Sequence, residues 1–142
     1  NLTECTSLSL FHNKLTGDIP YAVFEMTSLV SLDLNSNSLN LYTPTEIGLL
    51  IDLTYLNFRD NLLTFTLPNE LGNITSLQHL DLSSNSFSGS IPKSVEKLVS
   101  LTHLNMNDNM FSWPISPEIL SLSFLKILDL SYNHFSGSIP HQ

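Results

Sequence analysis

Residues 77–92 read LQHLDLSSNSFSGSIP, and the rest of the chain repeats this pattern. Within the stretch, leucines at positions 77, 80 and 82 precede Asn85, and Phe87, Ile91 and Pro92 follow it. Counting from Asn85 in steps of 24 residues reaches an asparagine every time, at Asn13, Asn37, Asn61, Asn109 and Asn133. A fixed period of this length, without insertions, predicts a solenoid in which each repeat packs on its neighbours.

Each repeat carries the same apolar columns. The position five residues before the asparagine is always leucine, at Leu8, Leu32, Leu56, Leu80, Leu104 and Leu128. The spacing of Leu80 and Leu82 has a period of two, which predicts a short strand with its leucines inward. Stacked repeats would therefore form a parallel sheet with strands about 4.8 Å apart. After the proline, a segment such as 69–74 has room only for 3₁₀ or short α-helical turns.

The recurring asparagine follows the strand, where the chain turns away from the sheet. Its amide is expected to lie inside and to bond the free backbone groups of the turning loop. This need for several hydrogen bonds explains why asparagine, and not leucine, recurs at the position.

The 24-residue unit resembles the plant-type leucine-rich repeat, through L-x-x-L-x-L-x-x-N-x-F-S-G-x-I-P in 77–92 and L-D-L-S-Y-N-H-F-S-G-S-I-P in 128–140. The resemblance implies an α/β solenoid, a right-handed superhelix or horseshoe, with a parallel concave β-sheet and short 3₁₀ or α turns on the convex side. Relatives of this type are ectodomains of receptor-like kinases and receptor-like proteins, and secreted inhibitors. The resemblance therefore implies an extracellular, non-catalytic module that binds a protein, a peptide or a glycan through its concave or lateral face.

We expect residues 1–142 to form a single array of about six repeats, as a fragment of a longer array that lacks both caps. The formal charge of −8, from 13 acidic and 5 basic residues, argues against a nucleic acid or an anionic membrane as the main partner. No run of 18 apolar residues occurs, so no membrane insertion by this segment is expected. Cys5 is alone, so no disulfide can form within the chain.

The outward positions of the predicted strands give the candidate ligand-binding residues. One column reads Ser7, Ser31, Tyr55, His79, His103 and Ile127, and the next reads Ser9, Asp33, Asn57, Asp81, Asn105 and Asp129. Aromatic and arginine side chains dominate binding hot spots. The candidate set on the concave face is therefore Tyr55, Asn57, Arg59, His79, Asp81, His103 and Asn105. The alternative is that these are solvated strand positions without a partner.

The sequence pattern gives little support for a catalytic site or a metal-binding site. His79, His103 and Asp81 share a face and are a weak candidate for zinc, but neighbouring histidines on an open sheet more often bind nothing. Acid pairs such as Asp81 and Asp129 lie on an open face without a pocket. No Ser-His-Asp, P-loop or metalloprotease motif is present, so we expect no enzyme activity, no metal and no cofactor.

Two other features of the sequence are expected on the surface of the fold. The sequons Asn1-Leu2-Thr3 and Asn73-Ile74-Thr75 predict N-glycosylation, with Asn73 the better candidate. Trp113 replaces the glycine found at Gly17, Gly89 and Gly137, and the same column holds Leu41 and Phe65. We expect these three bulky residues to form an apolar flank. The alternative function is thus a scaffold subunit docked into a larger assembly through this flank, or through open ends that pack against further repeats.

Overall fold

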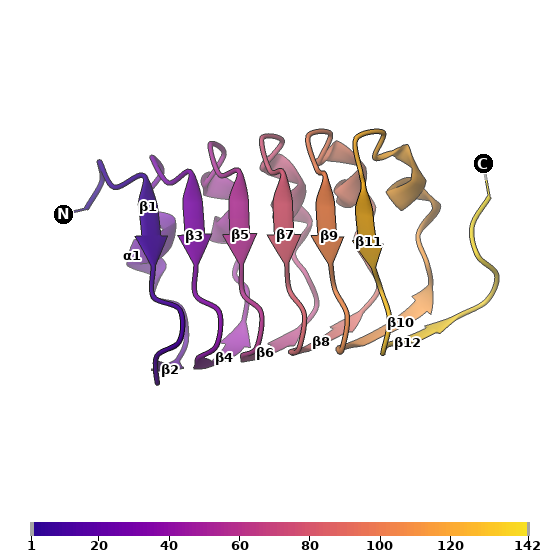
Figure 1. Cartoon of the computed structure of the whole chain (residues 1–142), viewed down its shortest axis with the longest axis horizontal. Helices are drawn as coiled ribbons and strands as arrows, with labels where there is room; N and C mark the ends of the chain where they lie inside the picture. Colours follow the sequence, from indigo (N-terminus) through magenta and orange to yellow (C-terminus); the bar gives the residue numbers. More distant parts are fainter. Residues whose placement is uncertain (1, 142) are drawn as a thin grey trace.

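A computed structural model describes residues 2–141, except for the side chains of Leu41 and Tyr42. The chain forms a solenoid whose concave face is a six-stranded parallel sheet, drawn along the front of Figure 1. Its strands are β1 (Ser7–Ser9), β3 (Ser31–Asp33), β5 (Tyr55–Asn57), β7 (His79–Asp81), β9 (His103–Asn105) and β11 (Ile127–Asp129). Equivalent residues pair across neighbouring strands, as Leu56 does with Leu80. The predicted concave sheet and its 24-residue register are confirmed.

A second six-stranded parallel sheet lies beyond the asparagine turn, and the sequence analysis did not predict it. Its strands are β2 (Thr16–Gly17), β4 (Ser38–Tyr42), β6 (Leu62–Phe65), β8 (Ser86–Gly89), β10 (Met110–Pro114) and β12 (His134–Ser136). Here Phe65 pairs with Phe87, 22 positions later. Equivalent residues are therefore two positions out of register, and the strands run at a slant to the stack (Figure 1).

The first five repeats each return along the back through one short helix. These helices are α1 (Tyr21–Phe24) and the 3₁₀ helices η1 (Thr45–Leu49), η2 (Asn69–Asn73), η3 (Lys93–Lys97) and η4 (Pro117–Ser121). Glu46, Glu70 and Glu118 lie in the first turns of η1, η2 and η4, where the helix dipole favours an acid. The predicted short turns on the convex side are confirmed. No helix within residues 2–141 has the length and apolar character needed to cross a bilayer.

The core runs through the stack as continuous columns. Leu56, Leu80 and Leu104 are each at most 1% exposed. Phe87, Phe111 and Phe135 stack face to face, with ring centroids 6.2 and 6.3 Å apart and interplanar angles of 13° and 7°. A column of nearly parallel rings therefore runs through the last three repeats.

The recurring asparagines form a hydrogen-bonded ladder. Asn85 accepts a hydrogen bond at Oδ1 from the backbone N–H of Leu63 at 3.0 Å. Its Nδ2 donates to the carbonyl of Phe58 at 2.9 Å, and also to the carbonyls of Leu82 and Ser83 in its own loop. Because Leu63 and Phe58 belong to the preceding repeat, this rung ties two repeats together, and the rungs at Asn37, Asn61, Asn109 and Asn133 do the same. The predicted pairing of the amide with loop backbone is confirmed.

Candidate functional site

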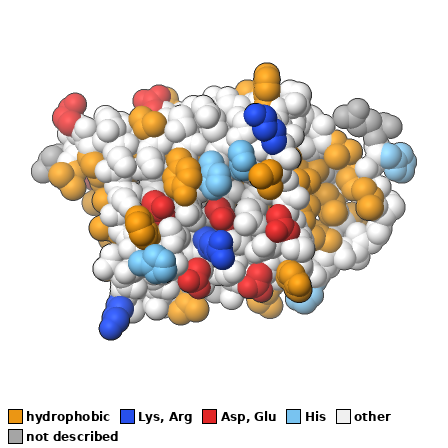
Figure 2. Space-filling view, viewed as in Figure 1, with side chains coloured by type: hydrophobic (Ala, Val, Ile, Leu, Met, Phe, Trp, Pro, Cys, Tyr) orange, Lys and Arg blue, Asp and Glu red, His pale blue; other side chains and the backbone are white. Residues whose placement is uncertain are grey.

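A row of three rings crosses the middle of the concave face. Tyr55, His79 and His103 occupy the first position of β5, β7 and β9, and they pair in register. Tyr55 stacks on His79 with ring centroids 4.7 Å apart and an interplanar angle of 13°. His79 and His103 lie 5.5 Å apart at a tilt of 35°. Figure 2 shows histidine side chains beside hydrophobic ones near the middle of this face. We call Tyr55, His79 and His103 the aromatic row.

Burial at the centre of the row lowers the pKa of His79. The nearby His103 acts in the same direction, whereas the carboxylates of Asp81 and Asp33 oppose the change. His79 is therefore neutral at neutral pH. A neutral imidazole stacks on a ring and still offers one hydrogen-bond donor and one acceptor. The row thus combines flat apolar area with directional polar atoms.

The side chains of Asn57, Asp81 and Asn105 accept hydrogen bonds from backbone N–H groups at the ends of these strands. The Oδ1 of Asp81 accepts from the N–H and the hydroxyl of Ser83 at 2.9 and 2.6 Å. The Oδ1 atoms of Asn57 and Asn105 likewise accept from the N–H two residues later, at 3.0 and 3.2 Å. Asn57 and Asp81 are each 8% exposed. All three side chains therefore shape the strand ends, and those of Asn57 and Asp81 offer little surface to a partner.

The same turn recurs at Asp129, where hydrogen bonds from Ser131 and Asn107 hold the pKa of the carboxyl below its usual range. The sequence carries a signal for this role, because the column is acidic or amidic in five successive repeats, at Asp33, Asn57, Asp81, Asn105 and Asp129. Asx side chains often bond the backbone two residues on. The sequence pattern predicted ligand-binding residues in this column, and the hydrogen bonds of its side chains to the backbone were not predicted.

Asn57 also supports the aromatic row, because its Nδ2 donates to the hydroxyl of Tyr55 at 3.1 Å. Thr102 holds His103 through a contact of 2.8 Å between Oγ1 and Nδ1. Arg59 follows β5 and is exposed, so it brings an accessible positive charge to the same face. The predicted residues that are not buried are thus Tyr55, Arg59, His79, His103 and Asn105.

The weak zinc candidate does not form a ligand cluster. The Oδ1 of Asp81 is engaged by Ser83, and its Oδ2 accepts from Asn105 at 3.4 Å. Throughout residues 2–141, no group of three or more His, Cys, Asp or Glu side chains is placed to hold a metal ion.

The structure describes the side chains of two of the three residues predicted for the apolar flank, and one of the two predicted glycosylation sites. Phe65 and Trp113 are 60% and 65% exposed, whereas the side chain of Leu41 lies outside the described part. Asn73 ends η2 and is exposed together with Thr75. Asn1, the other predicted glycosylation site, lies outside the described residues.

Comparison with known proteins identifies relatives of this solenoid. The family described as Leucine Rich Repeat matches residues 52–74, 76–98, 100–122 and 124–142. No curated protein matches the chain. Among solved structures, the ectodomain of the plant receptor kinase GASSHO1/SCHENGEN3 from Arabidopsis thaliana, in complex with CASPARIAN STRIP INTEGRITY FACTOR 2, is 37% identical with a TM-score of 0.97, over 98% of this chain and 17% of that chain.

Two further structures show the same likeness. The plant peptide hormone receptor RGFR1 in complex with RGF2 is 36% identical with a TM-score of 0.95, over 97% of this chain and 22% of that one. The Arabidopsis receptor kinase HAESA, in complex with the peptide hormone IDA and the co-receptor SERK1, is 30% identical with a TM-score of 0.86, over 93% and 22%. The chain spans about a fifth of the length of these structures.

Proposed function

The chain belongs to the leucine-rich repeat family, of the plant type seen in receptor-kinase ectodomains, and from this premise we propose that it recognises a peptide or protein partner without catalysis. The partner contacts the aromatic row and Arg59 on the concave face. Two of the relatives are a plant peptide hormone receptor and a receptor kinase in complex with a peptide hormone, which supports a peptide as the partner.

The aromatic row is the observation that carries this proposal. Its rings are already stacked and tied to Asn57 and Thr102 before any partner arrives. Binding to such a preorganised surface loses little side-chain entropy. Tyrosine and arginine are also enriched among the residues that dominate binding energy. The strands β5, β7 and β9 therefore carry the side chains of the concave sheet that are best suited to bind a partner.

Replacing Tyr55, Arg59 and His103 together by serine is expected to weaken peptide binding by at least tenfold, because hot-spot residues each contribute on the order of 2 kcal/mol or more. A suitable ligand is the strongest peptide selected from a random twelve-residue phage library panned on the unchanged protein. Fluorescence anisotropy then measures its Kd for both proteins. Serine is native to these columns at Ser31 and Ser83, so the fold should tolerate it.

The matched control replaces His12 and Tyr132 by serine. Both lie in a column that holds Ser36 and Ser84 in other repeats, and both are exposed outside the aromatic row. The control should keep the Kd unchanged. Equal affinity of the Tyr55, Arg59 and His103 variant would contradict the concave site, and failure to select any peptide would contradict peptide recognition.

We place the protein outside the cell, in line with its ectodomain relatives. Exposed Asn73 and Thr75 then form an accessible glycosylation site. Expressed through a secretory pathway, the chain should have an intact mass above 15.9 kDa that falls on enzymatic removal of N-glycans. Asn73→Gln should lose the shift that belongs to this site, with Asn1→Gln as its comparison. An unshifted mass in the unchanged secreted protein would count against this placement.

A further inference from the structure

Two large rings stand in the second sheet at positions whose backbone favours glycine. Gly17, Gly89 and Gly137 adopt φ values of 83°, 76° and 79°, and Phe65 and Trp113 adopt 68° and 71° in the same column. In this left-handed backbone conformation, a residue with a side chain is less stable than glycine. Core packing does not compensate, because Phe65 and Trp113 are 60% and 65% exposed. Strain held at an exposed position is a reason to look for function.

The strand between those that carry the two rings has glycine at the equivalent position. Neither ring pairs with this glycine, because Phe65 pairs with Phe87 and Gly89 pairs with Phe111. Phe65, Gly89 and Trp113 belong to β6, β8 and β10, which are consecutive neighbours in the sheet. Two strand spacings separate the outer strands, about 10 Å or more. A Cβ added at Gly89 would lie 2.7 Å from Cγ2 of Thr66. A side chain is therefore disfavoured at this position, and none rises from the surface at Gly89. We call the surface of Phe65, Gly89 and Trp113 the aromatic flank.

Two shallow, open hollows adjoin each other between the aromatic flank and the helices, and we call them together the groove. Trp113 borders a hollow of about 820 Å³ that also contacts Lys93 and Glu118. Phe65 borders a second hollow of about 610 Å³ that reaches Glu46 and Glu70. The two hollows share Thr66, Leu67 and Asn69 in their linings. An occupant could therefore lie across both rings and reach both sets of charges.

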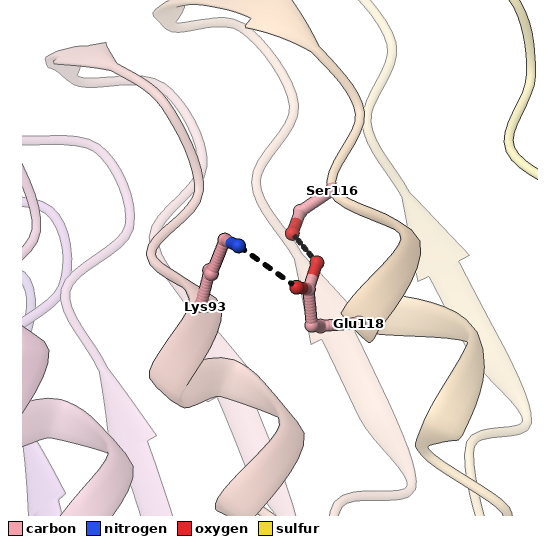
Figure 3. A network of polar contacts seen from close by, with 3 residues as sticks. All are labelled: Lys93, Ser116 and Glu118. Atoms are coloured by element: carbon pink, nitrogen blue, oxygen red, sulfur yellow. Dashed lines mark hydrogen bonds and ion pairs between the residues drawn. The ribbon is translucent and has the colours of Figure 1, made fainter.

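The groove has an excess of negative charge. It contains Glu46, Glu70 and Glu118, and Lys93 is its basic residue. The Lys93 Nζ lies 3.6 Å from Oε1 of Glu118, and the hydroxyl of Ser116 donates to Oε2, as Figure 3 shows. The hydrogen bond from Ser116, with help from Lys93, holds the pKa of Glu118 below its usual range. The charges of Lys93 and Glu118 thus offset each other, while the carboxylates of Glu46 and Glu70 leave a net negative charge that attracts a basic partner.

We propose that the aromatic flank and its groove form a second recognition surface, separate from the concave face, for an extended, proline-rich and basic segment of a partner protein. A polyproline II segment rises about 3.1 Å per residue and presents the same side every third residue, about 9 Å apart. Aromatic-lined grooves bind such segments because their rings pack on the prolines and the segment is already extended. The indole N–H of Trp113 and the ammonium of Lys93 can donate to its unpaired carbonyls. Basic residues of the segment would meet Glu46 and Glu70.

A synthetic peptide tests this directly. The probe is a fluorescein-labelled (Lys-Pro-Pro)₄ peptide, titrated with the protein and followed by fluorescence anisotropy at near-physiological salt. The combined variant Phe65→Gly and Trp113→Gly should lower its affinity at least tenfold and should keep or raise the unfolding temperature, because glycine is native to this column. Phe124→Ala removes another exposed ring, 66% accessible, and should leave the affinity unchanged.

Three further probes define what would overturn the inference. A (Lys-Gly-Gly)₄ peptide has the same charge and length without the prolines, and it should bind at least tenfold more weakly. The serine variant of Tyr55, Arg59 and His103 should bind (Lys-Pro-Pro)₄ normally, because the concave face is not involved. Absence of (Lys-Pro-Pro)₄ binding, equal binding by the double-glycine variant or by (Lys-Gly-Gly)₄, or loss in the concave variant would each overturn the proposal. Binding of a neutral oligosaccharide such as cellohexaose in place of the peptide would do the same and would assign the flank to glycans.

Discussion

Replacing Phe111 by alanine is expected to lower the free energy of unfolding by about 3–5 kcal/mol. Phe111 is 0% exposed and lies between the rings of Phe87 and Phe135, at 6.2 and 6.3 Å. Alanine would leave a cavity that the neighbouring rings cannot fill, because each is held by its own repeat. The lost free energy has two parts. One is the free energy of transferring the ring from water into the core, and the other is the van der Waals contact on both faces of the ring.

Denaturant unfolding, followed by circular dichroism and by the fluorescence of Trp113, measures this loss. Two probes are needed because unfolding of a repeat array can spread from one repeat to the next. Phe111→Leu should lose much less, about 1 kcal/mol, since leucine occupies the column at Leu15, Leu39 and Leu63. Phe124→Ala should stay within about 0.5 kcal/mol of the unchanged protein. A loss below about 1 kcal/mol for Phe111→Ala would contradict the importance given to the stack.

Replacing Asn109 by alanine is expected to lower the free energy of unfolding by about 1–3 kcal/mol, because it leaves buried backbone groups without partners. Asn109 is 7% exposed. Its Oδ1 accepts from the N–H of Phe87 at 2.9 Å, and its Nδ2 donates to the carbonyl of Leu82 at 2.9 Å. It also donates to the carbonyls of Met106 and Asn107 in its own repeat. Both of the first two bonds reach the preceding repeat, so the change also loosens the stack.

Asn13 supplies the matched control. It occupies the same column, is exposed, and donates only within its own repeat, to the carbonyls of Leu10 and Phe11. Asn13→Ala should therefore change the free energy of unfolding by less than about 1 kcal/mol. Hydrogen exchange adds a local measurement, since the N–H of Phe87 should exchange faster in Asn109→Ala. Equal losses at Asn13 and Asn109 would argue against the ladder as a link between repeats.

The candidate site was partly predictable. Period-two alternation told which strand residues point outward, so the columns of Tyr55 and Asp81 were both assigned to the concave face. Alternation does not tell whether an outward polar side chain faces solvent or bonds its own backbone. In the structure Asp81 bonds the backbone at Ser83, whereas Tyr55 stacks on His79. That difference depends on the path of the loop after the strand.

Sequence by itself determined the 24-residue period, the concave sheet, the inward columns and the bonding of each asparagine to the backbone of its own loop, because each follows from a residue type repeating at a fixed spacing. Only the tertiary structure showed that the amide also reaches the preceding repeat, as Asn85 does at Leu63 and Phe58. Only the tertiary structure decided the second sheet, whose 22-residue pairing depends on how the loops slant when repeats stack. It also decided that Phe65 and Trp113 lie in left-handed backbone. A shared register forces every repeat into one backbone path, whatever residue occupies it. The physical reason is that pairing between neighbouring repeats outweighs the local preference of a single residue.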